Sequence, residues 1–322
     1  MKKLMCKTTF AVCYVLLLAA SSHAATPVPK QIKIIVPFSA GASNDSIARV
    51  IAPQLGEKLK TSVIVENRAG AAGVIGSDYV AKAAKDGSVL LLNSSTFVTS
   101  AATQPTLPYD AIKSFVPIAM IGQGPLVVAV SSEKPYQSLG ELLEAARAHP
   151  KTLNYGSAGV GSLAHLASTL LNDAAKVDIT HVPYKGSANA AADLAGGRID
   201  FMLANYSSMA SLLPTGKVRL VATTAPGKHQ AFPQLPPAAQ TVPGYDVDIW
   251  VGVFAPAGTP EDLVKVLNRS LVEISRSRQL TALLDMDGTV PSDMSSAEFA
   301  SRVVQDLGRW KALASQHGIT AN

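Results

Sequence analysis

Cysteine is almost absent from this chain of 322 residues. Its two cysteines, Cys6 and Cys13, both lie in an N-terminal segment that has the features of a secretory signal peptide. Cleavage of that segment would leave a mature chain with no thiol. Such a chain can form no disulfide, use no cysteine nucleophile and build no thiolate metal site.

The N-terminal segment has a basic start, a short apolar core and a small-residue end. Three lysines stand among the first seven residues, an apolar run covers residues 10–20, and Ser22-His23-Ala24 fits cleavage after Ala24, with Ala25 as the near alternative. A membrane anchor is the competing interpretation, but the run is too short to span a bilayer readily. With no cysteine at the boundary, lipoprotein processing is not expected. We therefore predict a signal peptide over residues 1–24 and a periplasmic mature protein.

Strong charge of either sign is also missing. The formal net charge is +5, and removing Lys2, Lys3 and Lys7 with the signal peptide leaves +2. The remaining basic residues are scattered and form no stripe, so we expect no nucleic-acid partner. No later apolar run approaches membrane-spanning length. The mature chain of about 298 residues is long for one core and suits two domains.

Motifs of common catalytic and metal sites are absent. There is no G-x-S-x-G elbow, and acidic residues do not cluster as in magnesium or calcium loops. The mature histidines show no pairing at three- or four-residue spacing, which disfavours a helical zinc site. Ser162 and His165 form the one local pair worth naming for a hydrolase, but neighbours this close to a helix cap make a poor catalytic pair. We expect no catalytic residue, no metal and no cofactor.

Apolar strand-like runs alternate with amphipathic helix-like segments along the whole mature chain. Runs at residues 32–36, 63–66 and 89–92 alternate with helical patterns at 44–60 and 74–84, and the pattern restarts near residue 125. Near-continuous apolar strands separated by amphipathic helices are typical of parallel β-α-β units whose sheets are covered on both faces. The sequence therefore predicts an α/β fold.

The loop over residues 37–45 joins the first strand to the first helix. Its small residues allow a close approach of backbone to a ligand, and Ser43, Asn44 and Asp45 are good N-cap residues. The start of the helix offers free N–H groups and a positive dipole end, which suit a carboxylate. A plain capped turn is the alternative. Asp45 carries the wrong charge to touch an anion, so we expect it to cap the helix or orient the loop.

A second loop of the same kind covers residues 156–162 and leads into a helix that contains His165. Its glycine order is G-x-x-G-x-G, which is not the dinucleotide fingerprint, and no lysine is placed as in a P-loop. Ser157 and Ser162 can donate hydroxyl hydrogen bonds, and the helix start again favours an anion. His165 could reach a ligand from the first helical turn, although a lone helical histidine is more often structural.

A third loop, at residues 93–96, carries three hydroxyl groups directly after a strand. These groups can donate to a carboxylate or hold bridging waters. Ligands of open parallel sheets bind beyond the carboxyl ends of the strands, where all three loops are expected. The glycine-rich segment at residues 70–76 lacks the tight first glycine pair of a nucleotide site, so close backbone packing is the better interpretation.

Beyond these loops, the chain as a whole resembles the tripartite tricarboxylate transporter receptor family, the Bug-type periplasmic solute-binding proteins. The resemblance extends from about residue 32 to residue 310, and the order and spacing of the matching segments are specific. These segments are IIVPF at 34–38 with Gly41 and Asp45, VENR at 65–68 with Gly70 and Gly73, LPYD at 107–110, LNYGS at 153–157, HL at 165–166, HVPYKG at 181–186, Trp250, and APAGTP at 255–260.

The resemblance implies a two-lobed periplasmic binding protein of type II-like architecture. Its ligand cleft would lie between two mixed, mainly parallel sheets flanked by helices. Domain 1 would be discontinuous, formed by residues 25–123 and 248–322, and domain 2 would comprise residues 124–247. The protein would have no enzymatic activity, act as a monomer, and deliver a small carboxylate to the membrane permease subunits of a tripartite tricarboxylate transporter.

The resemblance also implies a set of ligand contacts, in which backbone N–H groups, hydroxyls and ordered waters replace an arginine clamp. The first lobe would contribute Phe38, Ala40, Gly41, Ala42, Ser43, Asn44, Asp45, Ser95 and Thr96. The second lobe would contribute Ser157, Ala158, Gly159, Ser162, His165, Ala204 and Asn205.

Two departures from the family's pattern affect the expected ligand. Ala42 replaces the second glycine of a Gly-Gly pair, which restricts the loop. Ala204 stands where the family often has an aspartate, and its neutral side chain argues against an amino acid ligand. We expect a dicarboxylate or an aromatic carboxylate. His181, Tyr184 and Lys185 are assigned to structure, with Lys185 and Gly186 turning into the next helix. An exported hydrolase-like enzyme and a ligand-presenting partner of a membrane sensor kinase are the alternative functions.

Overall fold

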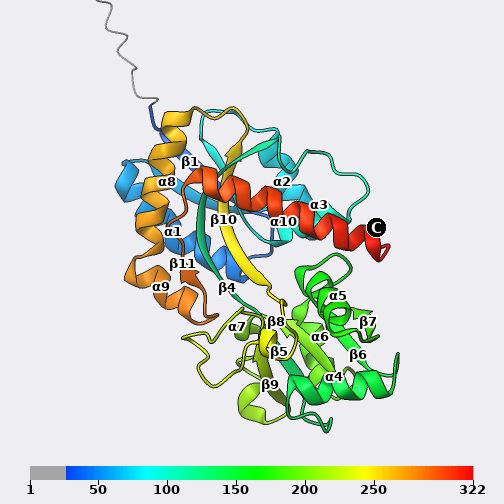
Figure 1. Cartoon of the computed structure of the whole chain (residues 1–322). Coiled ribbons are helices and arrows are strands. Elements are labelled where there is room, and N and C mark those ends of the chain that lie inside the picture. The colour runs from blue at the N-terminus through cyan, green and yellow to red at the C-terminus, as the bar shows by residue number, and fades with distance from the viewer. Residues whose placement is uncertain (1–26, 322) are drawn as a thin grey trace, which may run out of the picture.

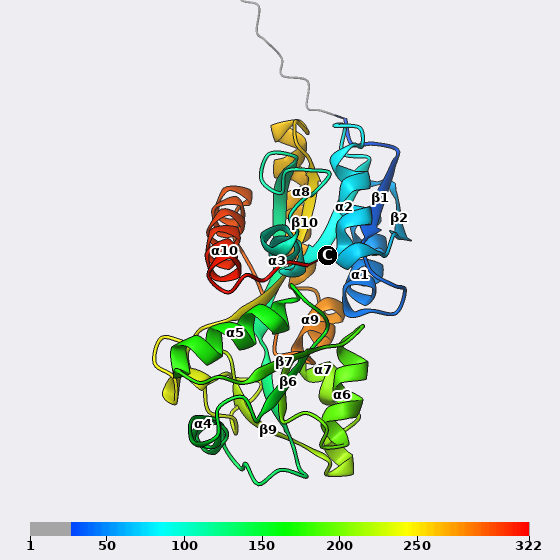
Figure 2. The same ribbon diagram turned by 90° about the vertical axis from the view of Figure 1, so that its right-hand side faces the viewer.

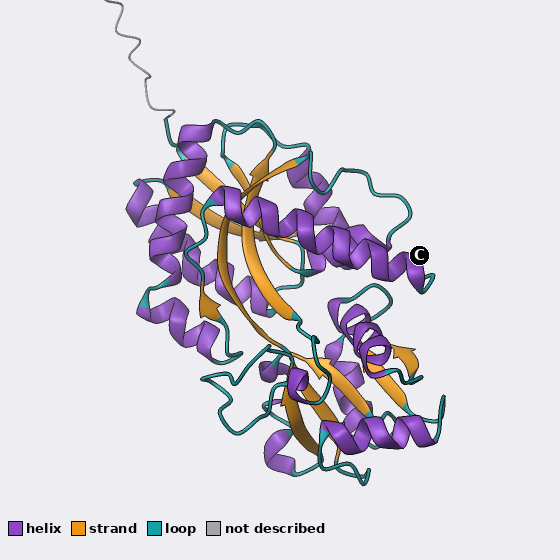
Figure 3. Cartoon of the chain, viewed as in Figure 1, coloured by secondary structure: helices purple, strands orange, loops and turns teal. Residues whose placement is uncertain are grey.

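The structure, a computed structural model, describes residues 27–321. The predicted signal peptide lies outside these residues. Two β-sheets, each flanked by helices on both faces, form two lobes that lie one above the other in Figures 1 and 3. We call the six-stranded sheet and its helices the first lobe, and the five-stranded sheet and its helices the second lobe. The predicted α/β class is confirmed.

The sheet of the first lobe has the strand order β11-β4-β10-β3-β1-β2. Strands β2 and β3 pair with β1 in parallel, whereas β10 runs antiparallel to β3 and β4, and β11 runs antiparallel to β4. The strands are β1 (Gln31–Val36), β2 (Ser62–Asn67), β3 (Val89–Ser94), β4 (Phe115–Pro125), β10 (Asp248–Pro256) and β11 (Val290–Pro291).

Helices cover both faces of this first sheet. One face carries α1 (Ser43–Leu59), α8 (Glu261–Ser275) and α9 (Arg278–Asp285), whose apolar side chains pack with Ile32, Ile34 and other strand residues into one core cluster. The other face carries α2 (Val74–Ala81), preceded by the short helix η1 (Ala71–Gly73), together with α3 (Thr96–Thr103) and α10 (Ser296–Gln316). Because both faces are buried, the strands read as continuous apolar runs in the sequence.

The sheet of the second lobe has the order β7-β6-β8-β5-β9. Its strands are β5 (Val127–Ser131), β6 (Asn154–Ser157), β7 (Thr180–Pro183), β8 (Phe201–Ala204) and β9 (Val218–Thr223). Helices α4 (Leu139–Ala148) and α5 (Leu163–Ala175) cover one face, and α6 (Ser187–Ala195) and α7 (Tyr206–Met209) cover the other. Short 3-10 turns η2 (Leu213–Thr215) and η3 (Ala238–Gln240) lie in the connections.

The prediction that both sheets are mainly parallel is wrong. In the described chain four strand pairs are parallel and five are antiparallel. The antiparallel pairs arise where the chain passes between lobes: β4 leads into β5, and β10 returns from the second lobe alongside β4. Every antiparallel pair contains one of these three strands, whereas strands joined through helices within one lobe pair in parallel. The sheets are mixed, as predicted.

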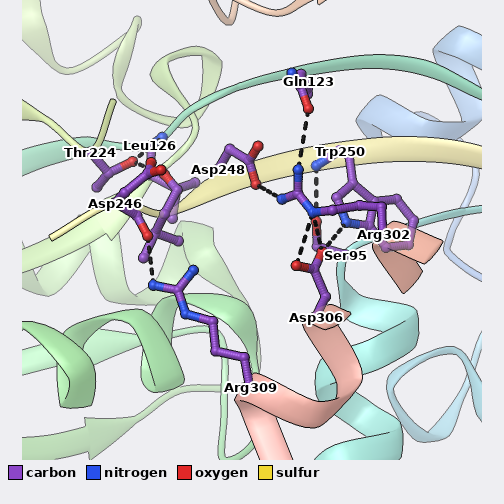
Figure 4. A network of polar contacts seen from close by, with 11 residues as sticks. Ser95, Gln123, Leu126, Thr224, Asp246, Asp248, Trp250, Arg302, Asp306 and Arg309 are labelled. Carbon is purple, nitrogen blue, oxygen red and sulfur yellow. Dashed lines mark hydrogen bonds and ion pairs between the residues drawn. The ribbon is translucent and has the colours of Figure 1, made fainter. Parts of the chain in front are cut away.

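The segments that pass between the lobes are joined by hydrogen bonds to one buried threonine. Thr224, directly after β9, donates through its backbone N–H to Leu126 O at 2.9 Å and accepts from Leu126 N at 2.8 Å, and its hydroxyl donates to Val247 O at 2.5 Å (Figure 4). Leu126, Tyr245, Val247 and Trp250 belong to a single core cluster that extends from α3 and α10 into α4 and α5. The lobes therefore share a continuous apolar core at the crossing. The exact residue limits of the two domains stay a prediction.

Charged side chains of α10 bind the start of β10, where the chain returns from the second lobe. Arg302 forms ion pairs with Asp248 and, at 2.9 Å, with Asp306, while Asp306 also accepts from Trp250 Nε1 at 2.8 Å (Figure 4). The end of α10 reaches the second lobe, where His317 lies 2.7 Å from Asp173 of α5. Figure 2 shows α10 and α5 on one side of the molecule and α1, α6 and α7 on the other. Among the described residues no helix combines the length and apolar character needed to cross a membrane.

Candidate ligand-binding site

The first loop, residues 37–45, is held by the carboxylate of Asp45. Asp45 is 2% exposed and accepts hydrogen bonds from Gly41 N at 2.8 Å, Asn67 Nδ2 at 2.9 Å and Arg49 Nε at 2.9 Å. The amide of Asn67 also donates to Phe38 O at 3.1 Å, which ties the loop to the end of β2. Asp45 therefore orients the loop from within the protein, in the role the sequence indicated.

The charge of Asp45 is stabilised where it lies. Burial by itself raises the pKa of Asp45, but hydrogen bonds from Arg49, the Gly41 backbone and Asn67 outweigh it and hold the pKa below its ordinary value. Gly41 has φ +83°, a conformation that favours glycine. Ala42, the N-cap residue of α1, has extended backbone angles and makes no side-chain cap, so the first N–H groups of α1 are left for another acceptor.

The third loop places Ser95 against the strand that returns from the second lobe. Ser95 N donates to Trp250 O at 3.0 Å, and Ser95 Oγ accepts from Trp250 N at 2.9 Å. The neighbouring Thr96 accepts from Ser94 Oγ at 3.3 Å and begins α3. Ser95 is 2% exposed. Its hydroxyl oxygen is thus used to attach the loop to β10, close to the crossing between lobes.

The second loop, residues 156–162, is held by neutral groups. Ser157 Oγ accepts from Gly159 N at 3.1 Å, lies 3.0 Å from Gly159 O and lies 2.7 Å from His181 Nε2 on β7. At the other end of the loop, Ser162 Oγ caps α5 by accepting from His165 N at 3.3 Å. Gly161 has φ +78° and faces the first lobe, since a Cβ added there would overlap Thr103 Oγ1.

Two histidines stack face to face behind this loop. The rings of His165 and His181 are 3.7 Å apart at 12°. Ser157 Oγ and His181 Nε2 share the shortest hydrogen bond of this loop, at 2.7 Å. His165 Nδ1 accepts from Gly161 N at 3.2 Å, so its ring proton is on Nε2. That Nε2–H has no hydrogen-bond partner among the described residues and remains a neutral donor.

Both imidazoles are kept neutral by their surroundings. Burial lowers the pKa of His165 to about 4. Burial, followed by the neighbouring His165, lowers the pKa of His181 to about 3. At neutral pH the second loop therefore rests on an uncharged pair of rings.

The two lobes also meet at the loop after β8. Ala204 is buried at the end of β8, and Asn205 is the N-cap residue of the short helix α7. Asn205 Nδ2 lies 3.5 Å from the carboxylate of Asp287, which belongs to the first lobe and also accepts from Ser207 N at 2.7 Å. The side-chain amide of Asn205 is thus already engaged by an internal carboxylate.

One cavity of about 40 Å³ lies between the lobes at this point and brings together part of the predicted site. Its walls include Ser43 and Asn44 from the N-terminus of α1, Asn205 from the second lobe, and Asp287. It has room for little more than a water molecule, so an organic acid could enter only if the lobes move apart. The other predicted residues do not line this cavity, although the three loops that hold most of them lie at strand ends, as predicted.

Several residues that shape the site were not identified from the sequence. Asn67 and Arg49 hold Asp45, His181 holds Ser157, and Asp287 reaches across from the other lobe. His181 does have the structural role assigned to it, and Gly186 is the N-cap of α6, as predicted. Asn67 stands in the VENR segment, one of those that resemble the family, and this was the sequence feature that could have identified it. In the described part of the chain no three histidine, cysteine or acidic side chains come together as a metal site would require.

Comparison with known proteins agrees with this architecture. The profile described as "Tripartite tricarboxylate transporter family receptor" matches residues 47–319. Protein BugT of Bordetella pertussis is 32% identical over 304 residues, which cover 94% of this chain and 93% of BugT.

Two solved structures are similar over their full length. One is Rpa4515 of R. palustris with adipate, 33% identical with a TM-score of 0.80 over 90% of this chain and 98% of that chain. The other is MatC from Rhodopseudomonas palustris with bound malate, 30% identical with a TM-score of 0.76 over 88% of this chain and 98% of that one. The predicted two-lobed architecture of a periplasmic binding protein is confirmed by these matches.

Proposed function

Because the chain belongs to the tripartite tricarboxylate transporter receptor family, we propose that it captures a small carboxylate between its lobes in the periplasm and delivers it to the permease subunits of such a transporter. The protein would bind its ligand without converting it, as a monomer, after removal of residues 1–24. Ligand would favour the closed arrangement of the lobes, which the permease then recognises.

The observation that carries this proposal is the position of the N-terminus of α1 at the interlobe cavity. Ser43 and Asn44 line that cavity, and the first N–H groups of the helix are free of intrahelical partners. A helix N-terminus of this length stabilises a negative charge. Among residues 27–321 no lysine, arginine or histidine lines the cavity, so the donors offered to a ligand there are uncharged.

The second lobe would supply matching donors from the start of α5. The hydroxyl of Ser162 caps the helix, and the neutral Nε2–H of His165 is free to donate. The remaining predicted contacts, from Phe38 to Ser43, at Ser95 and Thr96, and from Ser157 to Gly159, stay proposals for the same cleft. Asp45 would act by holding the first loop, since its carboxylate already accepts three hydrogen bonds.

The ligand class we propose is a dicarboxylate or an aromatic carboxylate. Similar proteins were solved with adipate and with malate, and Ala204 offers no acid to a ligand amine. Thermal-shift titration of the mature protein with succinate, citrate, terephthalate and glutamate tests this. At least one of the first three acids should raise the melting temperature, and mass spectrometry should recover it unchanged. Tight binding of glutamate with no response to the others would contradict the ligand class, and a converted ligand would contradict the binding role.

A further inference from the structure

The carboxylate of Asp287 spans the gap between the two lobes. Asp287 lies between α9 and β11, which belong to the first lobe. Its oxygens nevertheless accept from Ser207 N at 2.7 Å, Ser207 Oγ at 3.1 Å and Asn205 Nδ2 at 3.5 Å, all in the second lobe. With the lobes in this arrangement, the side chain is therefore held in one position by donors of the second lobe.

No cation neutralises this carboxylate in the described part of the chain. The ion pairs found there involve other acids, and Asp287 is only 9% exposed. Neutral donors stabilise a negative charge without cancelling it. The wall at Asp287 thus carries a fixed negative charge.

The same carboxylate lines the cavity that Ser43 and Asn44 line from the N-terminus of α1. One wall therefore presents the positive end of a helix, and another wall presents a negative side chain, across a cavity of about 40 Å³. At such short range, two like charges in a partly buried site repel strongly, and this kind of repulsion is how binding sites reject near-relatives of their ligands.

We propose that Asp287 is a specificity-determining residue that favours acids with one carboxylate and rejects a second carboxylate at the wall of the cleft. The inference rests on the proposed function and narrows its ligand class: the carboxylate of the ligand lies at α1, and the end that faces Asp287 is uncharged or a hydrogen-bond donor. An aromatic monocarboxylate fits this charge pattern better than a dicarboxylate of similar length.

Two matched pairs of acids test the proposal by calorimetric titration of the mature protein. Hexanoate and adipate share a six-carbon chain, and benzoate and terephthalate share a ring, so each pair differs by one carboxylate. The wild type should bind the monoacid of at least one pair more tightly. Asp287→Asn should raise the affinity for the diacid of that pair at least tenfold and change the affinity for the monoacid less than threefold.

Asp285→Asn is the matched control. It removes the same charge two residues earlier, at the exposed end of α9 where no side-chain hydrogen bond is formed in the described structure, and should leave both affinities unchanged. Asp287→Ser is a second neutral variant, for use if asparagine disturbs the fold. An unchanged ratio of diacid to monoacid affinity in the neutral variants, or a diacid preference in the wild type, would overturn the role of Asp287. Binding of succinate or citrate with no binding of any of the four acids would likewise overturn it, whereas absence of binding to every acid of both panels would reject the proposed function.

Discussion

The first loop, at residues 37–45, and the second loop, at residues 156–162, both follow a strand and lead into a long helix, but they are held by different kinds of interaction. The first is held by a charged carboxylate, Asp45, with donors from its own lobe. The second is held by Ser157 and two stacked neutral histidines, and its Gly161 lies against Thr103 of the other lobe.

Because different interactions hold the two loops, different changes should destabilise them. Burial of the Asp45 carboxylate with three donors makes the first loop dependent on a single side chain. The second loop depends on His165 and His181 remaining uncharged, and on the contact of Gly161 with Thr103 of the first lobe. One loop therefore behaves as a fixed part of its lobe, and the other can respond to acid and to closure.

Asp45→Ala is expected to have the largest effect. It leaves the N–H of Gly41 without its acceptor and removes one of the two acceptors of the Asn67 amide at a 2% exposed position, which should cost about 2–4 kcal/mol in the free energy of unfolding. Urea denaturation measures this cost. Glu261→Ala is the control, because Glu261 pairs with Lys265 at the same spacing on the exposed face of α8 and should leave the melting temperature nearly unchanged. Equal stability of the two variants would show that Asp45 does not hold the loop.

The role of Asp45 shows what the sequence could supply. A strand, a small-residue loop and an N-cap pattern predict the turn and the orientation of the helix, because these depend on neighbours in the chain. The partners of Asp45 are different, since Asn67 comes from the next strand and lies beside the loop only because β2 pairs with β1. Local pattern therefore identified the candidate loop but not what stabilises it.

Elements with weak local patterns were missed for related reasons. Helix α3 begins Thr96-Phe97-Val98-Thr99, and β-branched residues of this kind lower helix propensity. Strand β4 contains Pro117 and two glycines, which normally mark loops, yet it spans 11 residues because β10 pairs along it. Asp287 stands in a turn after α9, and only the packing of two lobes brings it to Ser207. Such contacts are set by tertiary structure and leave no periodic signal.

Alanine substitutions at two glycines compare the loops directly. Gly41 has φ +83° with no atom near its Cβ position, so Gly41→Ala should cost only the backbone strain, about 1 kcal/mol. Gly161 has φ +78° and an added Cβ would overlap Thr103, so Gly161→Ala should cost more, about 2–3 kcal/mol, and push the lobes apart. Thermal unfolding and small-angle X-ray scattering measure the two effects.

The double variant Gly161→Ala with Thr103→Ala separates strain from the contact between lobes. Removing the threonine hydroxyl and methyl should restore part of the lost stability and return the radius of gyration toward the wild-type value. If Gly161→Ala alone leaves the radius of gyration unchanged, the contact between the second loop and Thr103 does not affect the distance between the lobes.

Acid should weaken the second loop before the first. In the unfolded chain His165 and His181 take up protons at the ordinary histidine pKa of about 6.5. In the folded protein the pKa of His165 is about 4 and that of His181 is about 3. Their contribution to stability is therefore complete above pH 6.5 and is lost as the pH falls below it. Asp45 behaves differently, because its contribution is lost only as the pH falls from the ordinary aspartate pKa of about 3.9 toward its lower value in the folded protein.

His181→Gln tests this comparison, because the glutamine amide offers both a donor and an acceptor to Ser157 but does not titrate. Between pH 7.5 and pH 5 the wild type should lose about 1–2 kcal/mol more unfolding free energy than the variant, since one fewer histidine takes up a proton on unfolding. His149→Gln, at an exposed position, is the control and should follow the wild-type profile. Parallel pH profiles for the wild type and His181→Gln would mean that the stacked pair carries no proton-linked stability. The two loops would then differ in their contacts but not in their response to acid.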